Sequence, residues 1–306
     1  MNLYRRQKNK NKNWKLYFLA KRHDLHIQED NMLRNATALI TGGASGLGRS
    51  AASHILGCGG RVVIADLPAQ QALAESLLDT HPSAKERLVF SACDVTSESD
   101  VAKALDACSE LEGSPANVNV IVNCAGIATP GRIVGKKGAL PIARFQQVMD
   151  VNTVGTFNVC RLGAERMVNS ESPISPSSSS PKYEDARMDV ERGVIINTAS
   201  IAYQDGQIGQ AAYAASKGAI ASMTLPLARD LASKGVRCMA IAPGLFLTPL
   251  LEGLPEKVRD EMGSKVPFPN RLGDPSEFGD LVGCIVNNRM LNGEVIRLDG
   301  AYRMPP

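Results

Sequence analysis

The chain has 306 residues, 44% of them hydrophobic, which is enough to bury a full core, and no apolar run approaches the roughly 18 residues needed to cross a membrane. Its formal charge of +3 is unevenly spread: residues 1–34 hold nine lysines and arginines against three acidic residues, so the remainder holds 25 against 28. These properties exclude a membrane span and argue against a basic nucleic-acid-binding body, so nucleic acid is expected only through a complex.

Residues 1–35 form a leader rich in Lys and Asn, with one apolar patch at residues 14–19 and no acidic residue before Asp24. A basic, acid-poor leader is typical of a mitochondrial presequence. The alternative is a disordered leader with Met32 as the true start, in which case the protein is expected in the cytoplasm. Residues 36–306 are expected to form one domain.

From Ala36 onward, short apolar runs alternate with helical segments. The expected strands span residues 36–40, 61–65, 88–92, 118–122, 194–198, 236–242 and 294–298. The expected helices span residues 49–56, 68–79, 101–111, 145–168, a stretch from 209 that Pro226 should bend, and 275–288. This alternation predicts an α/β fold: a single Rossmann-type, doubly wound parallel sheet of about seven strands with helices on both faces.

Three segments interrupt this alternation. Residues 129–138 form a loop rich in Gly and Lys, and residues 243–269 form a loop rich in Pro. Residues 170–192 are rich in Ser and Pro and are expected to be a mobile insertion within the domain.

A glycine-rich segment, residues 41–48 with the sequence TGGASGLG, joins the first expected strand to the first expected helix. Gly42 permits the tight turn, and Gly46 and Gly48 let a pyrophosphate approach the backbone at the positive end of the helix. The segment therefore predicts a nucleotide cofactor.

Asp66 ends the second strand, 18 residues after Gly48, where a carboxylate accepts hydrogen bonds from an adenosine ribose. The same carboxylate would repel the additional phosphate of NADP, and neither Leu67 nor Pro68 offers a counter-charge. We therefore expect NAD. The alternative for Asp66 is a helix N-cap before Pro68.

Further polar groups follow the other strands. Asp94 ends the third strand, and Cys124-Ala-Gly126 follow the fourth. Taken singly, these are ordinary turn residues. Because the carboxyl ends of parallel strands share one edge of a sheet, we expect all of them to face one crevice.

Tyr213 and Lys217 stand four residues apart in an alanine-rich stretch, so they share one face of a helix. An ammonium group fixed near a phenol favours the phenolate and lowers the tyrosine pKa, which makes a general acid/base without histidine. The four histidines all lie in the first third of the chain and outside any cluster with metal-ligand spacing, so we expect neither a metal site nor a Ser-His-Asp triad. The alternative for the pair is an exposed tyrosine and lysine on an ordinary helix.

The seven cysteines are scattered and include no Cys-x-x-Cys pair, and the chain carries no secretory signal, so a reduced intracellular compartment fits best.

Together, these motifs resemble the short-chain dehydrogenase/reductase family, and the similarity extends from Ala36 almost to the C-terminus. It rests on TGGASGLG at 41–48, CDV at 93–95, NCAG at 123–126, Asn152, Ser200 and Tyr213-xxx-Lys217. Finer stretches resemble a branch whose members are mitochondrial homotetramers that act on 3-hydroxyacyl-CoA. These stretches are GTFNV at 155–159, GVIINTAS at 193–200, GQAAYAASKG at 209–218, IAPGLF at 241–246, RLGDP at 271–275 and LNGEVIRLDGA at 291–301.

The resemblance implies an oxidoreductase in which Tyr213 exchanges a proton with a secondary alcohol or ketone. Ser200 would hydrogen-bond the reacting oxygen, and Lys217 would lower the pKa of Tyr213 and bind the nicotinamide ribose. Asn152 would hold a water that links Lys217 to solvent; alternatively, it is a buried side chain tying a helix to a strand. Further cofactor contacts are implied at Ser45, Leu47, Asp66, Asp94, Val95, Cys124, Phe246 and Thr248.

The implied reaction converts a 3-hydroxyacyl-CoA to a 3-oxoacyl-CoA in fatty-acid or branched-chain β-oxidation. The alternatives are a hydroxysteroid dehydrogenase with the same residues and, outside catalysis, a scaffold subunit of a mitochondrial tRNA-processing complex. Residues 244–270, which are apolar and bounded by prolines, could close over an acyl chain or a steroid, unless their leucines belong to the core.

Overall fold

The computed structural model describes residues 32–111, 117–136, 138–170, 174 and 190–306. The predicted leader lies almost wholly outside these residues, and so does most of the predicted insertion at 170–192. The packed unit begins at Met32, earlier than expected, because Met32 and Leu33 are buried in the core. Within the described part of the chain, no helix has the length and apolar character that crossing a membrane requires.

Seven parallel strands form one sheet in the order β3-β2-β1-β4-β7-β8-β9. Their bounds are β1 Thr37–Thr41, β2 Arg61–Asp66, β3 Leu88–Ala92, β4 Val120–Asn123, β7 Gly193–Thr198, β8 Val236–Pro243 and β9 Val295–Leu298. The order reverses between β1 and β4, and such a reversal is where doubly wound sheets bind ligands. The predicted α/β fold with a Rossmann-type parallel sheet is confirmed.

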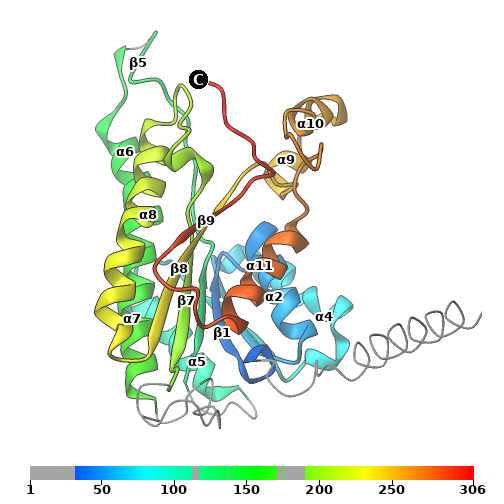
Figure 1. The fold of residues 1–306 in the computed structure, drawn as a ribbon, viewed down its shortest axis with the longest axis vertical. Helices are drawn as coiled ribbons and strands as arrows, with labels where there is room; N and C mark the ends of the chain where they lie inside the picture. Colours follow the sequence, from blue (N-terminus) through cyan, green and yellow to red (C-terminus); the bar gives the residue numbers. More distant parts are fainter. Residues whose placement is uncertain (1–31, 112–116, 137, 171–173, 175–189) are drawn as a thin grey trace, which may run out of the picture. The chain divides into compact units, whose positions relative to one another are not determined.

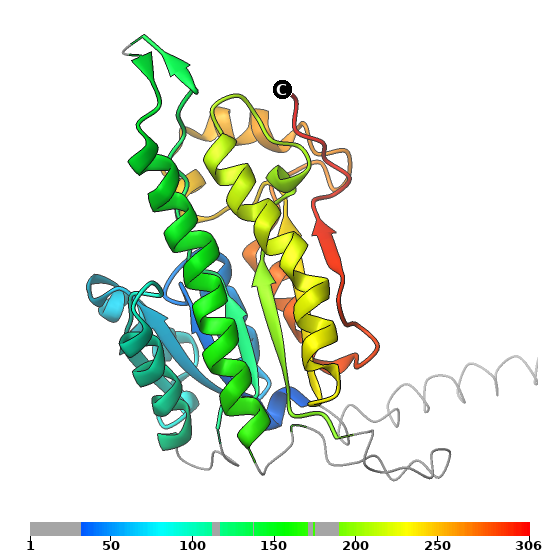
Figure 2. The ribbon, with the colours of Figure 1, turned by 90° about the vertical axis from the view of Figure 1, so that its left-hand side faces the viewer.

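Helices cover both faces of this sheet (Figures 1 and 2). On one face, α2 (Gly46–Gly57) packs against α11 (Pro275–Asn287). On the other face lie α5 (Glu98–Glu110), α7 (Thr156–Asn169) and α8 (Ala211–Ala232). Each crossover between neighbouring parallel strands therefore buries one side of the sheet.

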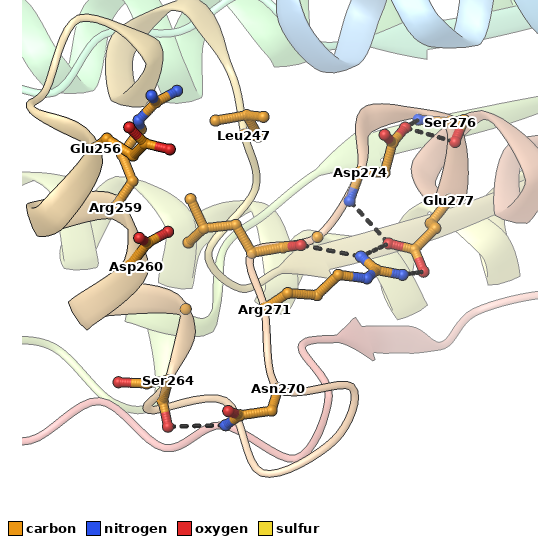
Figure 3. Close-up of a pocket in the computed structure, with 13 residues that line it drawn as sticks. Leu247, Glu256, Arg259, Asp260, Ser264, Asn270, Arg271, Asp274, Ser276 and Glu277 are labelled. Carbon is orange, nitrogen blue, oxygen red and sulfur yellow. Dashed lines mark hydrogen bonds and ion pairs between the residues drawn. The ribbon is translucent and has the colours of Figure 1, made fainter.

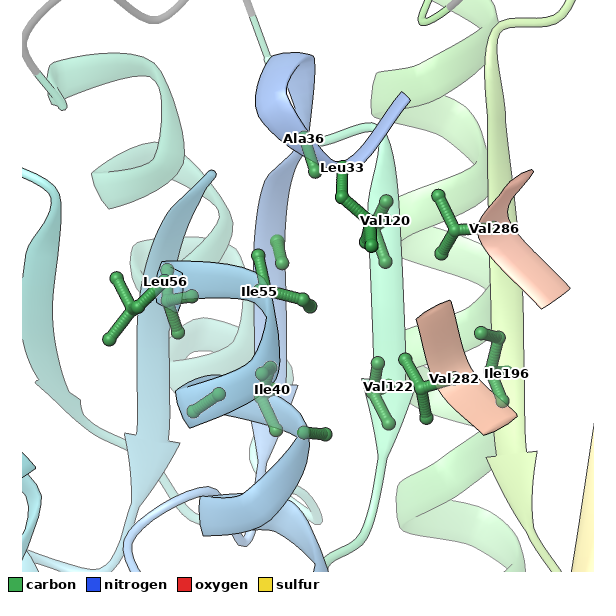
Figure 4. Close-up of a cluster of buried hydrophobic side chains, with 14 of the residues drawn as sticks. Leu33, Ala36, Ile40, Ile55, Leu56, Val120, Val122, Ile196, Val282 and Val286 are labelled. Carbon is green, nitrogen blue, oxygen red and sulfur yellow. The ribbon is translucent and has the colours of Figure 1, made fainter. Parts of the chain in front are cut away.

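Side chains along each central strand alternate between the two faces. In β1, Ile40 packs with the α2 and α11 side, shown in Figure 4, while Leu39 packs with the α5 and α7 side. In β4, Val120 and Val122 face the first side and Ile121 faces the second. Because both faces are covered, the strands read as continuous apolar runs, which is why the sequence located them.

Two predicted helices are interrupted in the structure. The helix expected at 145–168 consists of α6 (Ile142–Met149), a π-helical turn η4 (Asp150–Gly155) and α7. The helix expected at 68–79 consists of η2 (Pro68–Gln70), α3 (Gln71–Glu75) and α4 (Leu77–Thr80). Hydrophobic periodicity does not distinguish a π turn from an α turn, and one-turn breaks are shorter than the window over which periodicity is visible.

Short elements also lie outside the predicted strands and helices, including some in the two segments that were expected to be loops. They are β5 (Val134–Gly135), β6 (Gly138–Ala139), α9 (Pro249–Glu252) and α10 (Glu256–Gly263), together with the 3₁₀ turns η1 (Met32–Asn35), η3 (Pro82–Ala84) and η6 (Ile201–Tyr203). The β5–β6 hairpin, α9, α10 and the C-terminus all lie beyond the carboxyl ends of the sheet strands, at the top of Figures 1 and 2.

Candidate active site

A cleft of about 580 Å³ opens at the carboxyl ends of the strands on either side of the switch point. Ten residues predicted to bind a cofactor line it: Gly42, Ser45, Gly46, Leu47, Gly48, Asp66, Asp94, Val95, Cys124 and Thr248. The same cleft is also lined by residues that the sequence analysis did not single out, among them Gln70, Ile127, Gln147, Val151, Thr198 and Pro249.

The glycine-rich turn is packed too tightly for side chains at Gly42 and Gly48. Gly42 has φ +62°, and a Cβ there would lie 2.7 Å from the backbone nitrogen of Ala125. A Cβ on Gly48 would lie 2.3 Å from the carbonyl oxygen of Gly42. The first turn of α2 contains no acidic side chain, so the positive end of its dipole faces the cleft uncancelled. This arrangement fits a pyrophosphate.

Asp66 is held beside the glycine-rich turn. Its carboxylate accepts hydrogen bonds from the backbone nitrogens of Ala44, at 3.1 Å, and Leu67, at 2.8 Å. The 3₁₀ turn that follows has Leu67 as its N-cap and receives no side-chain cap, so the alternative of a helix-capping Asp66 is not what the structure shows. The neighbouring cation, Arg49, donates to the carbonyl of Leu73 and to the hydroxyl of Ser76.

The residues that follow β3 and β4 are fixed by local contacts. The Asp94 carboxylate accepts from the backbone nitrogen and hydroxyl of Thr96, at 2.9 and 2.7 Å. Cys124 Sγ lies 3.3 Å from the hydroxyl of Thr198, and burial raises the pKa of this thiol to about 11. Cys124 therefore stays protonated at neutral pH and is a poor nucleophile.

Phe246 is placed differently from the other predicted cofactor residues. It is buried in the core rather than lining the cleft, and a Cβ on Gly273 would lie 2.7 Å from its ring. The sequence does not distinguish a phenylalanine in the core from one that lines a pocket, because both stand in equally apolar stretches of the chain. Thr248, two residues later, does reach the cleft beside Gly46.

Ser200 lies two residues after the end of β7 and caps the 3₁₀ turn η6. Its hydroxyl accepts a hydrogen bond from the backbone nitrogen of Ala202 at 3.2 Å. Its side chain also lies near enough to Tyr213 to lower the pKa of that phenol. Ser200 and Tyr213 therefore lie near each other, and their roles in a reaction remain a prediction.

Tyr213 and Lys217 lie in α8, with Lys217 Nζ 5.8 Å from the centre of the tyrosine ring. Lys217 is buried and donates a hydrogen bond to the carbonyl of Thr198 at 2.7 Å; burial lowers its pKa to about 8. Burial also raises the pKa of Tyr213, and the nearby Ser200 side chain acts in the opposite direction. Burial therefore outweighs the lowering of the tyrosine pKa that was expected.

Asn152 is fully buried within the π turn η4. Its side-chain oxygen accepts from the nitrogen of Ile127 at 2.8 Å, and its amide donates to the Ile127 carbonyl at 2.9 Å and to the Ser216 hydroxyl at 3.0 Å. Ser216 in turn donates to the carbonyl of Tyr213 at 2.7 Å. Asn152 thus ties the turn after β4 to the helix that carries Tyr213.

Two partners in this network were not predicted. Ser216 lies three residues after Tyr213, inside the Tyr-xxx-Lys motif, and this spacing could have identified it as a neighbour on the helix. Thr198 contacts Lys217 through its backbone carbonyl, and a backbone group carries no signal in the sequence.

A larger cavity, of about 880 Å³, lies between α10 and the start of α11 (Figure 3). Arg271 forms an ion pair with Glu277 there, at 2.8 Å, and Asp274 accepts from the nitrogen of Ser276 to cap α11. Four acidic side chains and two arginines line the cavity: Glu256, Asp260, Asp274, Glu277, Arg259 and Arg271. The acidic excess disfavours phosphate, and the predicted site residues are absent from its lining, so the smaller cleft is the better cofactor site.

Residues 36–259 match the family model of the short chain dehydrogenases. The chain belongs to the short-chain dehydrogenase family. The predicted family resemblance is confirmed, and so is the prediction that the protein is an oxidoreductase. Members of this family use NAD or NADP.

Several dehydrogenases are similar to this chain over nearly its whole length. The human protein called 3-hydroxyacyl-CoA dehydrogenase type-2 is 50% identical over 276 residues, covering 90% of this chain and 97% of the relative. Its namesake from Drosophila melanogaster is 48% identical over 279 residues, covering 90% of this chain and all of the relative. The crystal structure of 3-hydroxyacyl-CoA dehydrogenase type-2 from Mycobacterium avium superposes with a TM-score of 0.78 at 36% identity, covering 92% of this chain and 100% of that one.

Proposed function

We propose that this short-chain dehydrogenase interconverts a 3-hydroxyacyl-CoA and the corresponding 3-oxoacyl-CoA, with NAD as its cofactor. The observation that carries the proposal is the convergence of Ser200, Tyr213 and Lys217 beside a cleft that is lined by the glycine-rich turn and Asp66. Similarity over 90% of the chain to dehydrogenases named for 3-hydroxyacyl-CoA supports this substrate class.

The cleft fits a dinucleotide on the protein's own geometry. The close-packed backbone at Gly42 and Gly48, with the N-terminus of α2, would hold the pyrophosphate, and Asp66 would accept hydrogen bonds from the adenosine ribose. The Asp66 carboxylate would also repel the additional phosphate of NADP, which favours NAD. When bound, NAD supplies the nicotinamide carbon that accepts the hydride.

Tyr213 is the group in this site suited to move the hydroxyl proton. With its pKa raised by burial, it is protonated at neutral pH and acts as an acid toward a ketone. In the oxidation direction, it must first lose its proton, and the neighbouring Lys217 ammonium favours the resulting phenolate. Ser200, which lies near Tyr213, would donate to the reacting oxygen as negative charge develops on it.

Asn152 would keep this arrangement in place. Its amide fixes Ile127 at the edge of the cleft and, through Ser216, the helical turn that carries Tyr213. We also propose that Asn152 holds a water next to Lys217. A Cβ on Gly126 would lie 3.2 Å from the Asn152 oxygen and 3.6 Å from Lys217 Nζ, so both polar groups face the same small space.

The substrate is tested by following NADH absorbance with the purified protein. We expect acetoacetyl-CoA to be reduced with a kcat/KM at least tenfold above that of any member of a panel of ketosteroids. Reduction of steroids alone would assign a hydroxysteroid dehydrogenase instead, and no NADH oxidation with either class would contradict the proposed reaction.

The cofactor is tested by Asp66→Ala. Loss of the ribose acceptor should weaken NAD binding by roughly tenfold, about the energy of a charge-assisted hydrogen bond, while NADP binding should be unchanged or improved. Glu75→Ala, which removes an exposed carboxylate from α3 in the same βα unit, is the matched control. Equal weakening of both cofactors by Asp66→Ala would contradict the ribose assignment.

We further propose that the protein is a homotetramer. Val154, Phe157 and Leu225 on the neighbouring helical segments η4, α7 and α8 are 53%, 46% and 43% exposed, which is unusual for large apolar side chains unless another subunit covers them. Light scattering during size-exclusion chromatography of the purified protein should give the mass of four chains. The mass of one chain would contradict this assembly.

The basic, acid-poor residues 1–31 support a mitochondrial location. A fluorescent protein fused after residue 31 should be imported into mitochondria, and a fusion lacking these residues should remain in the cytoplasm. Cytoplasmic fluorescence from both would contradict the targeting proposal.

A further inference from the structure

Arg297 lies on the edge strand β9, away from the lining of the cofactor cleft, and its guanidinium group is almost completely engaged. Nε donates to Asp299 at 2.7 Å, Nη1 to the side chain of Gln204 at 3.0 Å, and Nη2 to Asp205 at 2.7 Å and to the carbonyl of Tyr302 at 3.1 Å. The side chains of Arg297 and Asp205 are only 16% and 13% exposed. Strong, shielded hydrogen bonds of this kind hold their partners in fixed positions.

Two of these partners close the turn that carries Ser200. Ser200 caps η6, and the backbone nitrogens of Gln204 and Asp205 donate to the carbonyl of Ile201 at 3.1 and 2.9 Å. The side chains of the same two residues bind Arg297. A displacement of Gln204 or Asp205 would therefore move η6 and, with it, the Ser200 hydroxyl.

The other partners belong to the C-terminal segment, which also packs against Ile201 in the Ser200 turn. Tyr302 forms a small buried cluster with Ile201 and Val266. Further along, the side-chain amide of Gln207 donates to the carbonyl of Pro305 at 3.2 Å. The C-terminal residues thus contact the Ser200 turn at Ile201 and the segment that follows it at Gln207.

The charges explain why an arginine is needed at this position. Burial alone would raise the pKa of Asp205, but hydrogen bonding and charge from Arg297, with a further contribution from Arg303, lower it, so the carboxylate stays ionised. Asp299 is also partly buried, at 9% exposure, and shares the same guanidinium. Without Arg297, two partly buried carboxylates would face each other and repel, which would push the turn away from β9.

We propose that Arg297 is a positioning residue for the reaction: it ties the Ser200 turn to β9 and the C-terminal segment and so sets the distance between the Ser200 hydroxyl and Tyr213. This inference rests on the proposed function, in which Ser200 binds the reacting oxygen. It concerns residues 92 positions apart in the chain, which the sequence motifs do not connect.

The first test is a double-mutant cycle in the acetoacetyl-CoA assay. Arg297→Met should lower kcat by roughly 10- to 100-fold, the range for a misplacement near 1 Å, with KM for NADH within twofold of wild type. In a Ser200→Ala background, the same substitution should lower kcat by less than threefold, because the residue it acts through is gone. Full, multiplicative effects of the two substitutions would overturn the proposal.

The second test reads the turn directly and needs neither substrate nor cofactor. Hydrogen exchange at residues 203–205 should become at least tenfold faster in Arg297→Met, while exchange in α2 and α5 stays unchanged. Arg303→Gln is the matched control: Arg303 contacts the same Asp205 at 3.4 Å, but its side chain is 65% exposed, so its loss should change neither exchange nor kcat.

The two tests distinguish a wrong proposed function from a wrong role of Arg297. A wild-type protein that is inactive on acetoacetyl-CoA would contradict the proposed function, but the exchange result would still show whether Arg297 holds the turn. Unchanged exchange in an active enzyme would overturn the role of Arg297 alone. If Arg297→Met does not fold, Arg297→Lys retains the charge but lacks the fork that reaches both carboxylates, and should give an intermediate kcat and intermediate exchange; wild-type values would overturn the proposal.

Discussion

Burial moves the pKa values of Tyr213 and Lys217 in opposite directions, because it disfavours whichever form carries a charge. The neutral phenol and the neutral amine both become easier to hold, so the pKa of Tyr213 rises and that of Lys217 falls to about 8. At neutral pH, the site therefore contains a protonated tyrosine and a lysine that is still mostly cationic.

We predict that Tyr213→Phe lowers kcat by 10²–10⁴-fold, the range for losing a general acid/base, and leaves NAD binding within about threefold by calorimetry. The benzene ring keeps the packing of α8, so only the proton-transfer group is lost. Tyr302→Phe, which removes a hydroxyl from a side chain whose packing is apolar, is the matched control and should retain activity. Wild-type turnover in Tyr213→Phe would show that another group moves the proton.

The burial of Lys217 also predicts how the free energy of unfolding depends on pH. Its folded pKa of about 8 lies below the ordinary 10.5, so between these values the unfolded chain binds more protons and stability increases with pH. Below pH 8, both states carry the charge and the burial penalty is fully present. A difference of this size corresponds to about 3 kcal/mol.

The measurement compares urea unfolding of the wild type and Lys217→Met at several pH values from 7.5 to 10. The free energy of unfolding of the wild type should increase relative to that of the variant as pH rises through this range, by up to about 3 kcal/mol. Titrations of other groups cancel in the difference. A constant difference across the range would show that Lys217 is not desolvated as the structure indicates.

Among the elements, the π turn η4 has the clearest consequence for the site. It widens the helix where Asn152 meets the backbone of Ile127, so a buried amide satisfies both backbone groups of that residue. A regular α-helical turn would direct position 152 differently along the helix. A local irregularity thus connects the turn after β4 with α8.

The close packing of the glycine-rich turn predicts that an added methyl group weakens both NAD binding and the fold. Gly48→Ala places a Cβ 2.3 Å from the Gly42 carbonyl oxygen, so the turn must open. We expect NAD affinity to fall at least tenfold and the fold to lose about 1–3 kcal/mol, as in other overpacked sites. Gly218→Ala is the control, because nothing lies within 4 Å of the added methyl group in α8 and alanine favours the helix. Equal effects of the two substitutions in calorimetry would contradict the close packing of the turn.

Across the whole molecule, the carboxyl edge and the amino edge of the sheet have different roles. The carboxyl edge carries the candidate active site. At the amino edge, Arg237 at the start of β8 pairs with Glu191 at 2.8 Å and donates to backbone carbonyls of α11, including those of Ile285 and Val286. Arg237 and Glu191 are 6% and 3% exposed, so this cluster joins β8, α11 and the entry to β7 inside the protein.

We predict that Arg237→Met destabilises the fold by about 3–5 kcal/mol, because it leaves Glu191 as a buried carboxylate with a weaker partner. Tm should fall by roughly 10 °C, while kcat per folded molecule stays unchanged. Arg161→Gln is the control: it breaks an ion pair with Glu98 whose side chains are 41% and 69% exposed, which is worth at most about 1 kcal/mol. A fall in kcat without a fall in Tm would contradict the separation of the two edges.

Much of this protein could be predicted from its sequence alone. The apolar runs located all seven strands of the sheet. The central strands are buried on both faces and need no partner information to be recognised, and the edge strands β3 and β9 are only partly buried but still contain apolar residues. The glycine-rich turn, Asp66 and the Tyr-xxx-Lys motif indicated a nucleotide cofactor and a general acid/base, because this chemistry depends on short, fixed spacings, such as one helical turn between Tyr213 and Lys217. Together with the other motifs they carried the family resemblance that implied an oxidoreductase.

Only the tertiary structure shows the features that do not follow from short spacings in the sequence. The interruption of the helix at η4, the core position of Phe246 and the raised pKa of Tyr213 all depend on what surrounds a residue. The contacts of Lys217 with Thr198 and of Arg297 with Asp205 join residues 19 and 92 positions apart. Local pattern is set by backbone geometry within a few residues, whereas burial and distant pairing are set by how the sheet and helices pack.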